Sequence, residues 1–293
     1  MSERLISTPA LIADTTVHDL LPAHGGEPYR IFLHLPAKPE PQAGWPVLYM
    51  TDGNAVIGTA VDAMCAQAGY PLGTNVEHGV IVTIGYPVAG AYDPLRRSWD
   101  LGPPPGKTYP PFHDGGPEVR TGGAEEFLAF IEDELKPWVA SRARIDSGRQ
   151  TLYGHSFGGL FALYALFTRP LAFQTWIAAS PAIYWEDRLI DRFLQAFETA
   201  VPDDLKAQAI LSVGEYETEK LAPFQVGAVD EAKRLEHKKE TRTDEFARQM
   251  TERLSAIPGL SASFELHAGE NHMSILPVTV NRAVQAAFAV HHP

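Results

Sequence analysis

The hydrophobic pattern of the chain alternates between two periods. Short, continuously apolar runs such as WPVLYM at 45–50 and GVIVTIGY at 79–86 are typical of buried strands. Between such runs lie segments with a helical period, and in 124–142 the apolar positions 127, 128, 131, 135, 138 and 139 fall on one face. Two runs of alternating apolar and polar residues, 15–21 and 29–35, open the chain and predict antiparallel strands. The same criteria predict strands at 151–154, 173–180, 207–214 and 261–269, and helices at 60–69, 159–167, 188–201, 243–257 and 277–292.

The order of these elements predicts the fold class. Apolar strands that alternate with amphipathic helices indicate a mostly parallel central sheet with helices on both faces. The two opening strands add an antiparallel edge. Because no repeat and no change of composition divides the chain, we predict one α/β domain over residues 1–293.

Two segments do not fit the alternation. Residues 100–123 are rich in proline and glycine and are too long for an ordinary connection, which is typical of a binding loop or a lid. Residues 215–242 are highly charged and begin directly after a predicted strand. This second segment is either a solvated surface excursion or a cap over the functional site.

The composition excludes several classes of function. A net charge of −12, with no basic run, argues against a nucleic-acid-binding surface. The single cysteine, Cys65, allows no intrachain disulfide and no cysteine-type zinc site, and we expect it to be a small buried residue of a helix. No apolar run approaches the roughly 18 residues of a membrane span. The N-terminal stretch lacks the pattern of a signal peptide, so we expect a cytoplasmic protein. The alternative is a periplasmic protein from which the signal has been removed.

A serine stands at the corner between a predicted strand and a predicted helix, in the stretch YGHSFGGLF at 153–161. Gly154 and Gly158 flank Ser156 at the two offsets where a sharp strand-to-helix turn brings backbones too close for side chains. Ser156 is therefore the predicted nucleophile. The alternative is a tight turn with a purely structural role.

A serine hydroxyl reacts near neutral pH only with a base beside it. In a parallel α/β sheet with a nucleophilic serine at a strand-to-helix turn, the acid and then the histidine follow the serine along the chain, each after a later strand. His272 lies in the loop between the last predicted strand and the final helix, so it is the predicted base. His155 points away from its neighbour Ser156, and His267 lies within a strand.

The acid is expected directly after the strand at 207–214. The sequence EYETE follows at 215–219, and Glu217 stands three residues after Gly214, the usual offset of the acid in this turn. Glu215 is the second choice. The third is a dyad in which a backbone carbonyl orients the histidine.

The oxyanion that forms on attack needs preorganised donors. The first is the backbone N–H of Phe157, the residue after the nucleophile. The second is expected from the loop TDGNAVIG at 51–58, with Gly53 or Asn54 as the donor. The alternative is that this loop is merely a turn. A turn could also supply the donor, so the two interpretations are compatible.

With these residues laid out, the chain resembles the putative-esterase family of α/β-hydrolases, and in particular the siderophore esterases that open catecholate trilactones such as enterobactin and salmochelin. The resemblance covers nearly the whole chain. The segments that carry it are VLYMTDGNAV, VTIGYP, RRSWDLGPPP, GGAEEFLAFIEDELKPWV, YGHSFGGLFALYALF, AASPAIYW and ENHMSIL.

The resemblance implies an ester hydrolase with no metal ion or other cofactor and with a site for a bulky anionic small molecule. Arg96 and Arg97 become candidates for substrate binding, because guanidinium groups bind catecholate or carboxylate oxygens well. The alternative is that an arginine pairs with Asp100 and holds the loop. Tyr184 and Trp185, with Phe157, are candidates for aromatic walls of the site or are simply core residues.

Three hypotheses of function follow. The first is a serine hydrolase that cleaves a siderophore ester through an acyl-enzyme. The second is an esterase of another specificity, for feruloyl-like, S-formylglutathione-like or small aliphatic esters. The third is a non-catalytic binding protein on the same scaffold.

Overall fold

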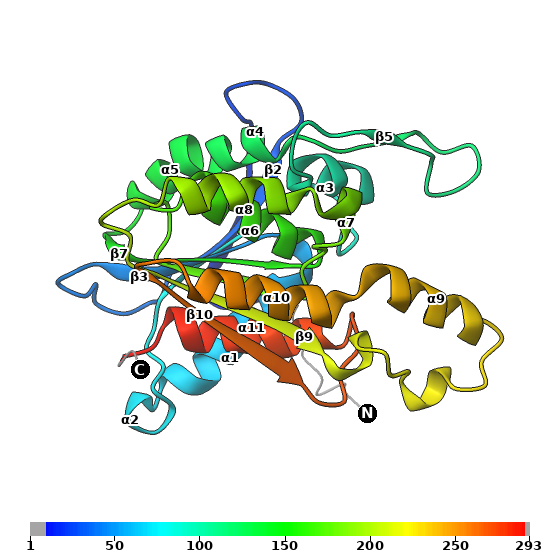
Figure 1. Cartoon of the computed structure of the whole chain (residues 1–293). Helices are drawn as coiled ribbons and strands as arrows, with labels where there is room; N and C mark the ends of the chain where they lie inside the picture. Colours follow the sequence, from blue (N-terminus) through cyan, green and yellow to red (C-terminus); the bar gives the residue numbers. More distant parts are fainter. Residues whose placement is uncertain (1–9, 291–293) are drawn as a thin grey trace, which may run out of the picture.

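The fold is built on one eight-stranded sheet with the strand order β1-β2-β4-β3-β7-β8-β9-β10. The structure is a computed structural model, and it describes residues 10–290 (Figure 1). β1 pairs antiparallel with β2, and β2 pairs antiparallel with β4, whereas all later neighbours in the sheet are parallel. The predicted α/β-hydrolase fold with an antiparallel N-terminal edge is therefore confirmed. The strands are β1 Thr15–Leu20, β2 Tyr29–His34, β3 Trp45–Met50, β4 Val80–Gly85, β7 Ile145–His155, β8 Thr175–Ala179, β9 Ala207–Gly214 and β10 Leu260–His267.

Helices cover both faces of the sheet (Figure 1). One apolar core lies between the sheet and α4, α6, α8 and α10, and the other lies between the sheet and the pair α1 and α11. The helices of these layers are α1 Gly53–Ala68, α4 Ala124–Ala129, α6 Phe157–Thr168, α8 Ile190–Thr199, α10 Thr243–Ser255 and α11 Ile275–Ala287.

The continuous apolar runs are explained by burial on both faces. Along β3, Val47 and Tyr49 enter the first core, whereas Leu48 and Met50 enter the second. Side chains alternate across a strand, so a strand covered on both sides has no polar face.

The predicted helix at 124–142 is one continuous helical run with an irregular centre. α4 passes into a π-helical segment, Phe130–Leu135, and then into α5, Lys136–Ala140. Phe130 and Ile131 are both buried within the π-helical segment. The apolar spacing predicted the helix but not its change of period.

The two irregular segments contain more secondary structure than the sequence predicted. The proline-rich segment begins within α3, Pro94–Leu101, and holds a small hairpin of β5, Thr108–Tyr109, and β6, Val119–Arg120. The charged segment holds two short 3₁₀ turns, Glu215–Glu217 and Pro223–Gln225, and then α9, Glu231–Thr241. Figure 1 shows α9 and the β5 hairpin projecting beyond the body of the molecule on the same side. The remaining short helices are α2 Pro71–Thr74 and α7 Trp185–Arg188.

The expectation that Cys65 is buried is wrong. Cys65 lies in α1 as predicted, but its side chain is exposed. α1 buries the neighbouring Met64 together with Val61 and Ala68, which lie on one helical face. Consecutive residues point about 100° apart on a helix, so Cys65 faces solvent.

Two expectations concern residues at the ends of the chain. Residues 1–9, on which the absence of a signal peptide partly rests, and 291–293, which include the end of the last predicted helix, lie outside the described residues. Among residues 10–290, no helix has the length and apolar character needed to cross a bilayer.

Candidate active site

Ser156 occupies a strained corner between the central strand β7 and α6. Its backbone has φ 60° and ψ −114°, a conformation that costs a non-glycine residue free energy. A Cβ atom at Gly154 would collide with the carbonyl oxygen of Gly158, and one at Gly158 would collide with the hydroxyl of Thr51. Close backbone approach therefore requires the glycine at position 154, as the motif predicted, whereas Gly158 leaves room for the side chain of Thr51.

The backbone of the corner is anchored to the neighbouring strand. The Ser156 N–H donates to the carbonyl of Ala179 at 2.9 Å, and the Ser156 carbonyl accepts from the N–H of Ala182 at 3.1 Å. These bonds offset part of the strain, because both backbone groups of Ser156 are satisfied. The side chain consequently projects from the carboxyl edge of the sheet.

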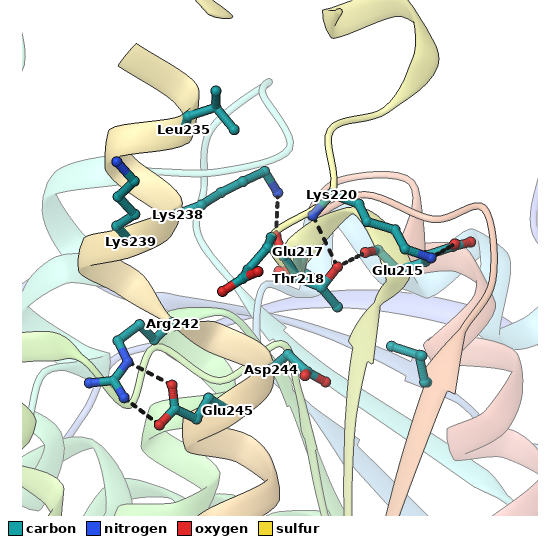
Figure 2. Close-up of a pocket in the computed structure, with 12 residues that line it drawn as sticks. Glu215, Glu217, Thr218, Lys220, Leu235, Lys238, Lys239, Arg242, Asp244 and Glu245 are labelled. Carbon is teal, nitrogen blue, oxygen red and sulfur yellow. Dashed lines mark hydrogen bonds and ion pairs between the residues drawn. The ribbon is translucent and has the colours of Figure 1, made fainter. Parts of the chain in front are cut away.

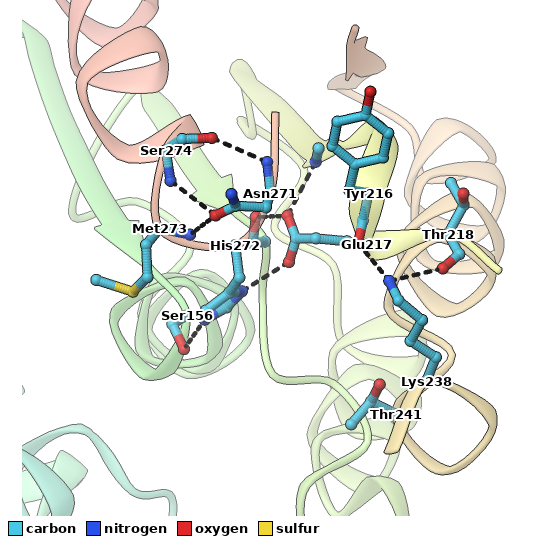
Figure 3. A network of polar contacts seen from close by, with 12 residues as sticks. Ser156, Tyr216, Glu217, Thr218, Lys238, Thr241, Asn271, His272, Met273 and Ser274 are labelled. Carbon is cyan, nitrogen blue, oxygen red and sulfur yellow. Dashed lines mark hydrogen bonds and ion pairs between the residues drawn. The ribbon is translucent and has the colours of Figure 1, made fainter. Parts of the chain in front are cut away.

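The structure brings Ser156, His272 and Glu217 into one chain of hydrogen bonds (Figure 3). The Ser156 Oγ lies 3.0 Å from His272 Nε2, and His272 Nδ1 lies 2.6 Å from Glu217 Oε2. The serine leaves β7, the glutamate follows β9, and the histidine follows β10. The carboxyl ends of parallel strands meet at one sheet edge, which is why residues so distant in the chain converge.

The other oxygen of Glu217 is held by two donors that the sequence analysis missed. Glu217 Oε1 accepts from the Ser180 hydroxyl at 2.5 Å and from the Gly214 N–H at 2.9 Å. Burial acts to raise the pKa of Glu217, but the hydrogen bond and charge of His272 and these two donors outweigh it, so the pKa lies below its ordinary value. Glu217 is therefore ionised at neutral pH. A serine directly after the strand β8 was the available signal for Ser180.

Glu215, the second choice for the acid, faces elsewhere. Its carboxylate accepts from Lys220 Nζ at 2.9 Å and from the Gly269 N–H at 2.9 Å. It therefore ties the turn after β9 to the turn after β10, while Glu217 contacts the histidine.

The loop that carries His272 is fixed by its neighbours in sequence. Asn271 Oδ1 accepts from the N–H groups of Met273 and Ser274 at 2.9 and 3.1 Å, and the Ser274 hydroxyl accepts from the Asn271 N–H at 2.9 Å. This is the local capping pattern expected of asparagine and serine before a helix, here α11. The orientation of His272 thus depends on short-range bonds as well as on Glu217.

His155 is not remote from the site. Its side chain is buried, with 5% exposure, and its ring centroid lies 4.8 Å from that of His272. Burial, followed by the nearby His272, lowers the pKa of His155 to about 3. His155 is therefore a neutral packing partner of His272 at neutral pH.

The predicted oxyanion donors lie at the starts of two helices. Phe157 is the first residue of α6, and Gly53 and Asn54 are the first two residues of α1. The first N–H groups of a helix have no intrahelical acceptor and are available to an anion. The Asn54 side chain is engaged, since it donates to the carbonyls of Tyr86 and Val88 and accepts from the Tyr86 N–H. Any contribution of Asn54 therefore comes from its backbone.

The guanidinium of Arg96 is hydrogen-bonded to other groups of the protein. It donates to the backbone carbonyls of Pro28 and Glu27 at 2.8 and 3.1 Å. The same group lies 4.7 Å from the ring centroid of Tyr86. Substrate binding by Arg96 remains a prediction, and the structure gives this side chain a role in packing.

Arg97 forms a two-bond ion pair with Asp52, the residue before Gly53. Its Nε and Nη2 lie 2.9 and 3.0 Å from the two carboxylate oxygens. The alternative that an arginine pairs with Asp100 is wrong, because the Asp100 oxygens accept from the hydroxyls of Tyr29 and Tyr86. Asp52 has φ 56°, so Arg97 fixes a left-handed residue directly before the predicted oxyanion donors.

The two aromatic candidates occupy different positions. Tyr184 lines a cavity of about 360 Å³ together with His272 and Glu217. Trp185 packs edge-on against Phe157, with 4.6 Å between ring centroids, and lies 5.0 Å from the ring of Tyr109 in the β5 hairpin. Tyr184 thus faces the cavity beside His272, and Trp185 joins the hairpin to the turn at Ser156.

A second, larger cavity adjoins the first. Figure 2 shows this cavity of about 900 Å³, which shares Glu217 and Lys238 with the smaller one. Its walls carry both signs of charge, such as the pair Arg242 and Glu245. In the part of the chain that the structure covers, no group of three or more His, Cys, Asp or Glu side chains is placed to hold a metal ion.

Comparison with known proteins agrees with this geometry. Residues 23–271 match the family described as "Putative esterase". The chain belongs to this family. It is accordingly a carboxylic ester hydrolase.

Named relatives of this esterase come from bacteria and fungi. It is 36% identical over 283 residues to the ferri-bacillibactin esterase BesA of Bacillus subtilis, covering 96% of this chain and 91% of that protein. It is also 36% identical to the siderophore triacetylfusarinine C esterase of Aspergillus fumigatus, covering 90% and 89% of the two chains. Among solved structures, the BES protein from Bacillus cereus superposes with a TM-score of 0.83 at 31% identity, covering 98% of this chain and all of that one.

The Arg97–Asp52 pair is expected to stabilise the esterase whether or not it contacts substrate. The side chains of Arg97 and Asp52 are 19% and 5% exposed, so Arg97→Ala leaves a buried carboxylate unpaired. We expect the free energy of unfolding, from urea titration, to fall by about 3 kcal/mol. Arg30→Ala is the matched control, since Arg30 makes the same two-bond pair with Asp19 at 29% and 41% exposure. It should cost less than about 1 kcal/mol. Equal losses in the two variants would contradict this assignment.

Acid destabilisation of the esterase should depend on His155. Its folded pKa of about 3 lies below the ordinary value of 6.5, so the unfolded state binds more protons between these pH values. The free energy of unfolding should therefore fall as the pH drops from 6.5, by up to about 1.4 kcal/mol per pH unit from this group. We expect His155→Leu to flatten the slope measured by urea titration between pH 6.5 and 4.5, and the exposed His24→Leu to leave it unchanged. An unaltered slope in His155→Leu would refute the assignment.

Proposed function

We propose that this esterase hydrolyses the ester bonds of a siderophore, and that the substrate is a catecholate trilactone of the enterobactin type. The names of the relatives support a siderophore ester, since they include esterases of ferri-bacillibactin, triacetylfusarinine C and enterobactin. The sequence segments that resemble catecholate siderophore esterases support the narrower substrate.

The roles of the residues follow from their contacts. His272 accepts the proton of Ser156 as the Oγ attacks the ester carbonyl, and Glu217 stabilises the imidazolium that results. Backbone N–H groups of Phe157 and of Gly53 or Asn54 bind the oxyanion. His272 then gives the proton to the departing alcohol oxygen, and an acyl-enzyme remains on Ser156. Water, deprotonated by His272, releases the acid and restores the serine.

One observation carries this proposal. The hydrogen bonds from Ser156 to His272 and from His272 to Glu217 form an unbroken chain at a strained corner. A binding protein has no need of a hydroxyl, an imidazole and an ionised carboxylate in this order. The non-catalytic alternative is thereby disfavoured.

Siderophore hydrolysis is testable directly. We expect the esterase to convert enterobactin to its linear products, followed by liquid chromatography with mass detection, with a catalytic efficiency at least about a hundredfold above that for p-nitrophenyl butyrate. Ser156→Ala should lose activity on both esters while keeping its circular dichroism spectrum and unfolding midpoint. Rapid butyrate hydrolysis with enterobactin left intact would favour an esterase of another specificity, and activity in folded Ser156→Ala would overturn the proposal.

A further inference from the structure

One face of α9 is turned toward the cavity that contains His272, and it is basic. Arg234, His237, Lys238 and Thr241 all line this cavity of about 360 Å³. Their spacing of i, i+3, i+4 and i+7 places them on a single helical face. We call these four residues the α9 basic face.

This face is not a packing surface. A helix that lies against a protein normally buries apolar residues at this spacing. In α9 the only buried residue is Thr241, at the end nearest the body, and the helix projects beyond the sheet (Figure 1). Apolar packing therefore does not explain why basic side chains occupy the inward positions.

The lining of the cavity is electropositive within an acidic protein. The chain carries a net charge of −12. Among the residues that line this cavity, Glu217 is the only carboxylate, and its oxygens are committed to His272, Ser180 and the Gly214 N–H. The lining thus holds two cations, Arg234 and Lys238, against one carboxylate, and the ion-pair partner of Arg234, Asp230, does not line the cavity.

Two of these side chains are held in place by the protein. Lys238 Nζ donates to the backbone carbonyls of Tyr216 and Thr218, on either side of Glu217 (Figures 2 and 3). Arg234 pairs with Asp230, the residue directly before α9, at 2.7 Å. Both cations are therefore positioned before any ligand arrives, which lowers the entropy cost of binding an anion.

Apolar groups beside the basic face complete a site for aromatic anions. Phe224 and Met273, which are 72% and 56% exposed, line the same cavity, as does Tyr184. Exposed apolar and aromatic side chains next to guanidinium and ammonium groups suit a ligand that is aromatic and negatively charged.

We infer that the α9 basic face is a subsite for anionic catecholate oxygens, and that it makes the esterase prefer the ferric complex to the iron-free siderophore. This inference rests on the proposed function. Three doubly deprotonated catecholates around one ferric ion form a trianion, whereas the iron-free catechols are protonated at neutral pH. Only the ferric form gains attraction from Arg234 and Lys238 as it approaches His272.

The test uses inhibition, so that it does not depend on siderophore hydrolysis. The probe is a hexadentate tris-catecholamide without ester bonds, in its ferric and iron-free forms, as an inhibitor of p-nitrophenyl butyrate hydrolysis. The readout is the ratio of the two inhibition constants, because changes in basal turnover cancel in it. We expect the ferric form to inhibit the unaltered esterase more strongly.

Variants of α9 should change this ratio in opposite directions. Arg234→Gln should weaken ferric inhibition by about threefold to tenfold, and Arg234→Lys should restore most of it. Asp230→Asn frees Arg234 from its partner and should strengthen ferric inhibition by about twofold. Lys233→Gln removes the same net charge from the neighbouring exposed position, which does not line the cavity, and should leave the ratio unchanged.

The outcomes separate this inference from the proposed function. Equal inhibition by the two forms, or equal effects of Arg234→Gln and Lys233→Gln, would overturn the subsite. Enterobactin hydrolysis with equal inhibition would leave the proposed function standing alone. If the ferric form inhibits selectively through Arg234 but the esterase leaves enterobactin intact, the anion subsite stands. The proposal that enterobactin-type trilactones are the substrate is then rejected.

Discussion

The sharp turn at Ser156 is the constraint on which the rest of the site depends. Its backbone is held in an unfavourable region by hydrogen bonds to Ala179 and Ala182, and by two glycines whose positions admit no side chain. The turn aims the hydroxyl away from the sheet, toward the one place where the loops after β9 and β10 can reach it. Those loops are bonded to each other, since the Tyr216 N–H donates to the Glu270 carbonyl at 2.8 Å. The strain is thus supported by a network that also fixes Glu217 and His272.

The sequence predicted the residues of the site that follow a strand, but not the side-chain contacts between segments that are distant in the chain. Ser156, Glu217 and His272 were predictable because each follows a recognisable strand, and strand order then determines where they meet. Ser180, which donates to Glu217, and Asp52, which pairs with Arg97, were not predicted. Each is a side-chain contact between distant segments, and no local pattern specifies its partner. His155 was judged by its direction relative to Ser156, while its contact with His272 depends on the path of the loop after β10.

The segments outside the alternating pattern have distinct parts in the architecture. The proline-rich segment is tied to α7, the short helix after β8, through Glu186, which accepts from the Tyr109 hydroxyl at 2.7 Å. It thereby braces Trp185, which packs against Phe157. The charged segment instead supplies Glu217 near its start and the projecting helix α9 at its end. The sequence predicted a cap or a solvated excursion there. The structure shows a helix whose outer faces are solvated and whose inner face lines the cavity over the acid and the base.

The most direct test of the account is the rate at which a fluorophosphonate labels Ser156, followed by mass spectrometry of the tryptic peptide in the folded protein. We expect a single adduct, on Ser156, and labelling that is slower by about a hundredfold or more in Glu217→Gln, because the neutral amide no longer stabilises the His272 imidazolium. Labelling at another residue, or equal rates with and without the Glu217 carboxylate, would contradict it.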